Sequence, residues 1–385
     1  SAGNARFVVA GTRNLRAWFT TALATGGASL LGADALAMTT EEIADAADAA
    51  GNAVTTDKAA SIYESTRGWP VAVRLALSMP SGSGAGAGVA LPGDDLLADY
   101  IVQTVLHGLR PELVAFVLAA TTCTRVTAGL AEVLSENPDA ASLLNECLAQ
   151  GLFIDRYIDG DNAPVYRWHE VFARHCRIAN RRADESRVSE LNLSAARWLS
   201  SRFPAEATVH AMRANSPEFA AQIIRENWVR LVIESQAALL NARCLALPPS
   251  FANDPEILLI RACCLDVQGD PTGAQILLSR VRSLIDAADR EPDEQLRRTR
   301  AFAELFLAHD PQTLSLAADH VRMFLHTAGA TDNVDTHALF LLGWVELRLR
   351  RDPVDAVRLL TAARRDADAG GHHVLAGRAT ANLML

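Results

Sequence analysis

Apolar side chains recur every three or four residues along most of the chain, which is the spacing of one face of an α-helix. The clearest example lies near the end, where five positions form one continuous stripe: Ala338, Leu341, Leu342, Val345 and Leu349. Such a stripe requires a neighbouring helix to cover it. Strand-like alternation is confined to short stretches, so the pattern predicts a mainly α protein.

The first residues follow a different pattern. A β-branched run, "RFVVAGTR" (6–13), predicts a buried strand, "NLRAWFTTAL" (14–23) predicts a helix, and "ASLLGADAL" (28–36) predicts a second strand. Parallel strands are normally paired and covered on both faces, so two strands alone cannot make a stable sheet. We therefore interpret 1–37 as the end of a larger α/β domain.

A small helical domain is predicted at 38–80. Thr39 and two following glutamates suit a helix start, and a second helix follows at 56–68. Trp69 stands between Gly68 and Pro70; because proline suits the first helical turn and restricts the residue before it, a third helix should begin at Pro70. The Gly- and Ser-rich stretch 81–93 predicts a flexible linker.

Residues 94–182 predict a winged-helix domain. Four helical patterns precede two strand-like runs, "LFIDRYI" (152–158) and "PVYRWH" (164–169), which flank the turn "DGDNA", and a closing helix follows. The helix before the wing, 139–150, contains two acids and no arginine or lysine. A helix that reads DNA in a groove should not have this composition.

The last third repeats with a period of about forty residues. Asp270-Pro271, Asp310-Pro311 and Asp352-Pro353 each predict a helix start, with aspartate as the cap and proline in the first turn. Each pair follows another predicted helix. This arrangement indicates a tetratricopeptide-like (TPR-like) solenoid.

Composition excludes several classes of function. The net charge of -9 over 385 residues argues against a broad nucleic-acid surface, and no stretch has the apolar length of a membrane helix. No secretion signal opens the chain, and six scattered cysteines suit reduced, buried thiols, so we expect a cytoplasmic protein. A Walker A loop binds phosphate with a lysine that follows a glycine-rich stretch. Lys58 is the only lysine in this sequence and no such glycines precede it, so the sequence contains no Walker A loop.

The order of these parts resembles MalT-like, large ATP-binding LuxR-type transcriptional regulators of the STAND class of signal-transducing NTPases. The segments that match are "VVAGTR", "MTTEEIADAA…TRGWPVAVRLAL", "LLNECLAQGLFI" and "YRWHEVFARHCR". The resemblance implies three nucleotide contacts: Arg13 near the terminal phosphate, Pro70 against adenine, and His169 on the ADP phosphate. It also implies that Walker A and B segments would precede residue 1 and that a DNA-binding helix-turn-helix would follow residue 385.

The predicted fold is mainly α: a remnant of an α/β NTPase domain (1–37), a small helical domain (38–80), a linker (81–93), a winged helix (94–182), a helical connector (183–250) and a TPR-like α-solenoid (251–385).

The resemblance implies a sensing and autoinhibitory portion of an ATP-dependent regulator, with an effector on the solenoid. The expected cofactor is ATP or ADP in the intact protein, which would be a slow ATPase switch; this chain alone would not retain the nucleotide. Expected partners are the NTPase core and further copies on activation, with DNA reached only through the missing domain and no membrane. The alternative is a scaffold that binds a peptide or protein on its repeats without nucleotide switching.

Each candidate residue also has a purely structural interpretation. Trp69 can fill the core beneath Pro70, and His169 can be a packing residue beside Trp168. His372 and His373 are adjacent, so their side chains point in different directions on a helix and cannot readily bind one metal ion together. We expect both side chains to contact solvent. Cys176 lies near two histidines, but no oxyanion loop or orienting third group can be assigned for a thiol hydrolase.

Overall fold

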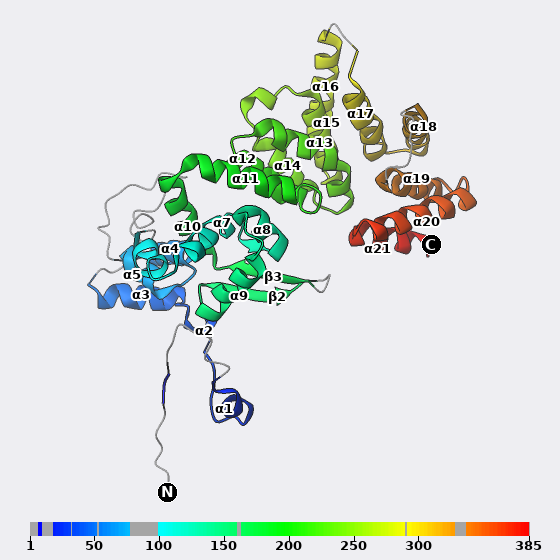
Figure 1. Cartoon of the computed structure of the whole chain (residues 1–385). Helices are drawn as coiled ribbons and strands as arrows, with labels where there is room; N and C mark the ends of the chain where they lie inside the picture. The colour runs from blue at the N-terminus through cyan, green and yellow to red at the C-terminus, as the bar shows by residue number, and fades with distance from the viewer. Residues whose placement is uncertain are drawn as a thin grey trace. The chain divides into compact units, whose positions relative to one another are not determined.

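The computed structural model describes residues 7–9, 18–31, 33–51, 54–77, 99–159, 163–288, 291–327 and 336–384. In these residues the chain is mainly helical, with one small sheet (Figure 1). It divides into two compact units, Ser1–Trp198 and Leu199–Leu385. The finer domain boundaries drawn from the sequence stay predictions. No helix in the described ranges is both long enough and apolar enough to cross a bilayer.

The start of the first unit differs from the sequence prediction. Only residues 7–9 of the predicted first strand (6–13) are among the described residues. They are exposed and have no regular structure. The predicted helix at 14–23 corresponds to a short α1 (Thr20–Ala24). The predicted strand at 28–36 is wrong: this segment ends in a short helix, α2 (Ala33–Leu36). A strand needs a hydrogen-bonded neighbour, and the sheet found in the described residues lies elsewhere in the chain.

The small helical domain is confirmed. It contains α3 (Thr40–Ala49), α4 (Thr56–Thr66) and α5 (Pro70–Leu77), and the third helix begins at Pro70 as predicted. The Thr39 side chain accepts from the Glu42 backbone N–H, and the Thr39 backbone N–H donates to the Glu42 carboxylate, which is a complete capping box. Ile43, Ile62 and Val73 form the shared core of the three helices. The predicted linker lies outside the described residues.

The winged helix is also confirmed. Its strands pair antiparallel in the order β1-β3-β2, with Ile154 opposite Trp168 in the wing hairpin. The hairpin follows α9 and leads into α10 (Figure 1). The elements are a π-helical segment η2 (Ile101–Leu106), α7 (Pro111–Ala120), β1 (Arg125–Val126), α8 (Ala128–Ser135), α9 (Ala140–Gln150), β2 (Ile154–Ile158), β3 (Pro164–Trp168) and α10 (Glu170–Ala183).

The second unit is a run of helices after α11 (Glu185–Leu199), which spans the boundary between units. Within it α15 packs on α16, α17 on α18, and α19 on α20. The elements are α12 (Pro204–Arg213), α13 (Pro217–Ile233), α14 (Ala237–Leu245), the 3-10 turn η3 (Pro249–Phe251), α15 (Pro255–Val267), α16 (Pro271–Ala287), α17 (Glu294–Phe306), α18 (Pro311–Thr327), α19 (Thr336–Leu349), α20 (Pro353–Ala369) and α21 (His373–Leu383).

The repeat prediction is confirmed at its helix starts. Helices α16, α18 and α20 begin at Pro271, Pro311 and Pro353, and the preceding aspartate of each accepts backbone N–H bonds from the first turn. The stripe on α19 is buried from Ala338 to Val345. Gly343 lies in the contact with α20, because a β-carbon there would come within 2.8 Å of the Leu360 Cγ.

Candidate functional site

The chain approaches Trp69 through a tight left-handed turn. Arg67 (φ 51°) and Gly68 (φ 72°) end α4, and the Met38 backbone N–H donates to the Gly68 carbonyl at 2.8 Å. A β-carbon at position 68 would lie 2.3 Å from the Met38 carbonyl oxygen, so only glycine fits. Pro70 is exposed at the start of α5, and Trp69 beside it is half-buried.

His169 lies where the second wing strand passes into α10. It is the N-cap residue of that helix and is half-buried, and its backbone N–H donates to the Phe153 carbonyl at 2.8 Å. The His169 side chain does not cap the helix. The first N–H groups of an α-helix have no acceptor within the helix and carry its positive dipole end, so this terminus suits an anion.

Trp69 contacts the His169 region directly. The two rings meet edge-on with centroids 6.3 Å apart, and the Trp69 ring lies 5.0 Å from the Phe153 ring, also edge-on. Phe153 in turn stacks on Phe172 at 5.0 Å. These aromatic side chains form one cluster, which we call the junction cluster, between the small helical domain and the winged helix.

Two polar contacts reinforce the junction cluster. The Arg67 Nε lies 3.6 Å from the Glu170 carboxylate, and both side chains are exposed. The Arg174 guanidinium donates to the Ser65 carbonyl at 3.0 Å. Both contacts join α4 or its end to α10. The exposed ion pair adds little on its own, because solvent screens it.

The structure therefore brings two of the three predicted site residues to one place. Pro70 adjoins Trp69, whose ring contacts His169, and Arg13 lies outside the described residues. Trp69 packs on Phe153 and His169. The nucleotide roles of Arg13, Pro70 and His169 stay predictions.

Sequence reasoning missed Phe153, Arg67 and Arg174. Phe153 has a positive φ of 54° and lies two residues after the α9 cap at Gly151, and the paired residues come from segments about a hundred positions apart. The one local signal was a large aromatic close behind a helix-ending glycine. Nothing local in the sequence marks the partners of Arg67 and Arg174.

The helix before the wing is acidic in the structure as well. Arg110 from the start of α7 donates to Glu146 of α9 at 2.7 Å, and this hydrogen bond holds the pKa of the Glu146 carboxyl below its usual value. Because Arg110 neutralises Glu146, the feature of α9 that bears on DNA is that the helix has no arginine or lysine for contact with a phosphate backbone.

Cys176 is a packing residue. It is fully buried, and burial raises the pKa of its thiol to about 12. A thiol is nucleophilic only as the thiolate, so this side chain is inert at neutral pH. Neighbouring His175 is also buried, and its Nδ1–H donates to the Val171 carbonyl at 2.7 Å within the helix. In the described ranges no group of three or more potential ligands is arranged to hold a metal ion.

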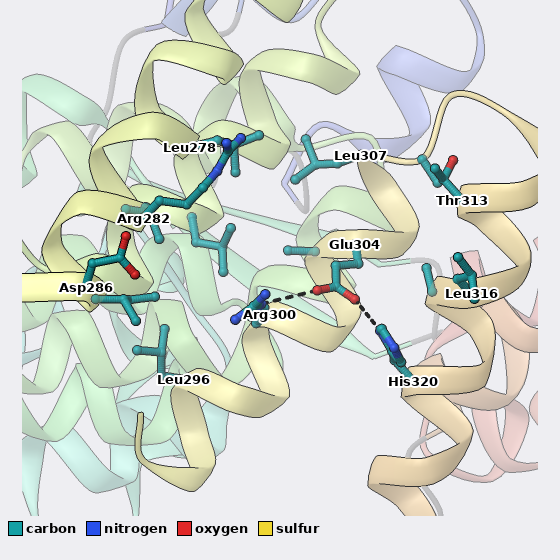
Figure 2. Close-up of a pocket in the computed structure, with 16 residues that line it drawn as sticks. Leu278, Arg282, Asp286, Leu296, Arg300, Glu304, Leu307, Thr313, Leu316 and His320 are labelled. Carbon is teal, nitrogen blue, oxygen red and sulfur yellow. Dashed lines mark hydrogen bonds and ion pairs between the residues drawn. The ribbon is translucent and has the colours of Figure 1, made fainter. Parts of the chain in front are cut away.

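A pocket of about 620 Å³ opens in the second unit between α16, α17 and α18 (Figure 2). Its walls are mostly leucine, valine, isoleucine and alanine side chains. Three polar side chains are linked across it: the Arg300 Nε lies 3.2 Å from one Glu304 oxygen, and the His320 Nδ1 lies 2.6 Å from the other. A pocket of this size and composition suits a small molecule.

Comparison with known proteins matches the winged-helix region to one family. Residues 102–188 match the MalT winged helix domain. The serine/threonine-protein kinase PknK of Mycobacterium tuberculosis is 31% identical over 195 residues, which cover 50% of this chain and 17% of PknK. The HTH-type transcriptional regulator MalT of Yersinia pestis is 28% identical over 243 residues, which cover 61% of this chain and 27% of MalT.

Among solved structures, the chain aligns with a signal transduction ATPase with numerous domains (STAND) from Pyrococcus horikoshii, which has a tetratricopeptide repeat sensor. The alignment covers 90% of this chain and 56% of the Pyrococcus chain. The TM-score is 0.37 and the identity 14%. The chain spans about a sixth of PknK and about a quarter of MalT.

Proposed function

We propose that this chain, whose residues 102–188 match the MalT winged helix domain, is the signal-sensing and autoinhibitory portion of an ATP-dependent transcriptional regulator. In this proposal a bound nucleotide keeps the winged helix folded against the small helical domain. An effector on the helical repeats, together with ATP, releases it, and the activated protein oligomerises. The protein would act in the cytoplasm.

One observation carries the proposal: the ring contact between Trp69 and His169 joins the small helical domain to the winged helix. A switch requires a contact that one state makes and the other lacks, and a ligand shifts the balance only by its difference in affinity for the two states. A nucleotide held by both sides of the junction cluster would favour the closed state.

The residues at the junction suit an adenine nucleotide. Pro70 presents an exposed ring at a helix start, where an adenine can pack, while His169 and the first turn of α10 offer N–H donors to a phosphate. The His169 ring can donate an N–H to a phosphate oxygen at this place. Arg67 pairs with Glu170, which offsets the acid closest to this helix start. The nucleotide, when bound, would supply an anionic bridge between the two modules.

The test uses the intact regulator. We expect His169→Ala to raise basal transcription without effector, because the closed state loses a phosphate donor. His107→Ala is the matched control, since His107 is an exposed histidine of the same unit and takes no part in the junction. Basal output is read from a reporter promoter at matched protein levels.

Unchanged or lower basal output from a folded His169→Ala protein would contradict the autoinhibitory role. An increase shared by the His107→Ala control would contradict it too, because the effect would then not depend on the junction. If the His169→Ala regulator still responds normally to its effector, the response does not need His169. The alternative function, a binding scaffold without nucleotide switching, would then be favoured.

A further inference from the structure

The pocket between α16, α17 and α18 has an apolar body. Leu278, Val281 and Ile285 face it from α16, Leu296 from α17 and Leu316 from α18. Several of these side chains are only partly covered; Leu316 remains 60% exposed. Contact with an aliphatic group would remove this surface from water, which is favourable in proportion to the area covered.

Most polar groups that line the pocket already have partners within the protein. Arg300 and His320 both contact the Glu304 carboxylate, as described above. Thr313 donates to the Asp310 carboxylate at 2.8 Å. These groups have less to offer a ligand, since a new bond would replace an existing one.

Arg282 and Asp286 are different. Both lie on α16, one turn apart, and line the pocket from the same side (Figure 2). In the part of the chain that the structure describes, neither side chain has a hydrogen-bond or ion-pair partner. The pocket therefore offers one cation and one anion, held a helical turn apart beside an aliphatic wall.

We propose that this pocket binds a small zwitterion with an aliphatic body, such as an apolar amino acid or dipeptide. The Arg282 guanidinium receives the ligand carboxylate, for which its fork of donors is suited, and the Asp286 carboxylate receives the ammonium group. The aliphatic side chains of the ligand lie against Leu278, Val281 and Leu296. This inference names the class of effector and so rests on the proposed function.

The pocket volume agrees with this class. About 620 Å³ lies in the range of small-molecule sites and leaves room for a dipeptide with ordered water. A purely apolar ligand would form no bond with Arg282 or Asp286, and a simple anion would bring a second negative charge towards Asp286. The two side chains therefore favour a ligand that carries one group of each charge.

The experiment is isothermal titration of the full chain with L-leucyl-L-leucine. N-acetyl-leucine amide removes both charges, and glycylglycine removes the aliphatic body. We expect leucylleucine to bind, and each of the other two probes to bind at least tenfold more weakly. Arg282→Gln and Asp286→Asn should each weaken leucylleucine binding at least tenfold. Both side chains are exposed, so the variants should fold, which circular dichroism checks.

Arg280→Gln is the control, because Arg280 lies on the same helix but does not line the pocket. It should leave binding within twofold of the unmodified chain. The proposal is overturned by absence of binding at millimolar leucylleucine, by equal binding of the uncharged probe, or by full affinity in the Arg282→Gln and Asp286→Asn variants. The titration reads ligand binding without transcription or nucleotide, so it can fail while the switch at His169 stands, and the reverse.

Discussion

Gly68 is the residue on which the geometry of the junction cluster depends most. It combines a positive φ with a backbone contact so close that a methyl group would overlap the Met38 carbonyl oxygen. The same turn carries Arg67 to Glu170 and Trp69 to His169. Any change that opens this turn should therefore disturb both contacts with the winged helix.

Replacement of Gly68 by alanine should destabilise the small helical domain by more than the strain of a positive φ alone. Gly51 provides the comparison, because its φ is 76° and nothing lies within 4 Å of the position of its β-carbon. We expect Gly51→Ala to cost about 1 kcal/mol and Gly68→Ala at least about 3 kcal/mol. Urea unfolding followed by circular dichroism measures both. Equal losses would show that the Met38 contact yields easily.

Glu346 is a buried acid with a defined role between α18 and α19. Burial opposes its ionisation, but hydrogen bonds from Arg351, at 2.7 Å, and from Arg322 outweigh burial and hold the pKa of this carboxyl below its usual 4.5. A carboxyl whose pKa is lowered on folding stabilises the protein above its unfolded pKa. That contribution is lost as the pH falls through the folded pKa.

Glu346→Gln should therefore lower stability at pH 7 and make it less sensitive to acid. We expect a loss of roughly 1–3 kcal/mol at pH 7, because two arginines lose their charged partner. Below about pH 4.5 the difference from the unmodified protein should shrink. Denaturant unfolding at pH 7 and pH 3.5 tests this, with exposed Glu291→Gln as control. A difference that grows at low pH would contradict the account.

At the scale of elements, helix starts in the repeats were well predicted from sequence. Aspartate followed by proline specifies a cap and a first turn by local chemistry alone, so α16, α18 and α20 begin where expected. The strand expected at 28–36 failed because a strand depends on a pairing partner that no local pattern supplies.

The cap of α20 offers a direct test of that local chemistry. Asp352 accepts from the backbone N–H groups of Val354 and Asp355 at 3.0 and 2.9 Å. Asp352→Ala should cost about 1 kcal/mol, while Asp352→Asn should cost only a small part of this, since asparagine caps equally well. Thermal unfolding of the two variants measures the difference. Equal losses would mean that the charge, and not the cap, stabilises the helix.

The candidate site shows the same limit of sequence reasoning. Trp69, Pro70 and His169 could be found because each stands at a helix start with a distinctive neighbour. The contact between Trp69 and His169 could not be derived from spacing, because it joins positions a hundred residues apart. It lies beside Phe153, whose backbone conformation is unusual for a side chain of that size. The resemblance to a family implied only that Pro70 and His169 contact one nucleotide, which stays a prediction.

At the scale of the whole molecule, the proposed nucleotide junction and the proposed effector pocket lie in different units. The first unit contains the junction that a nucleotide would close, and the second contains the pocket that an effector would fill. Coupling between them is a difference in free energy, so effector affinity and nucleotide affinity must change by the same factor. A regulator built in this way needs no DNA-binding surface on its winged helix, in agreement with the lack of arginine and lysine on α9.

The most direct measurement of the central claim is the rate at which the intact regulator releases a fluorescent ADP analogue. If His169 donates to the nucleotide phosphate, His169→Ala should release the analogue about tenfold faster, which corresponds to about 1.4 kcal/mol, while His107→Ala releases it at the unmodified rate. Equal release rates from the unmodified protein and His169→Ala would contradict the claim that the junction between the small helical domain and the winged helix holds the nucleotide.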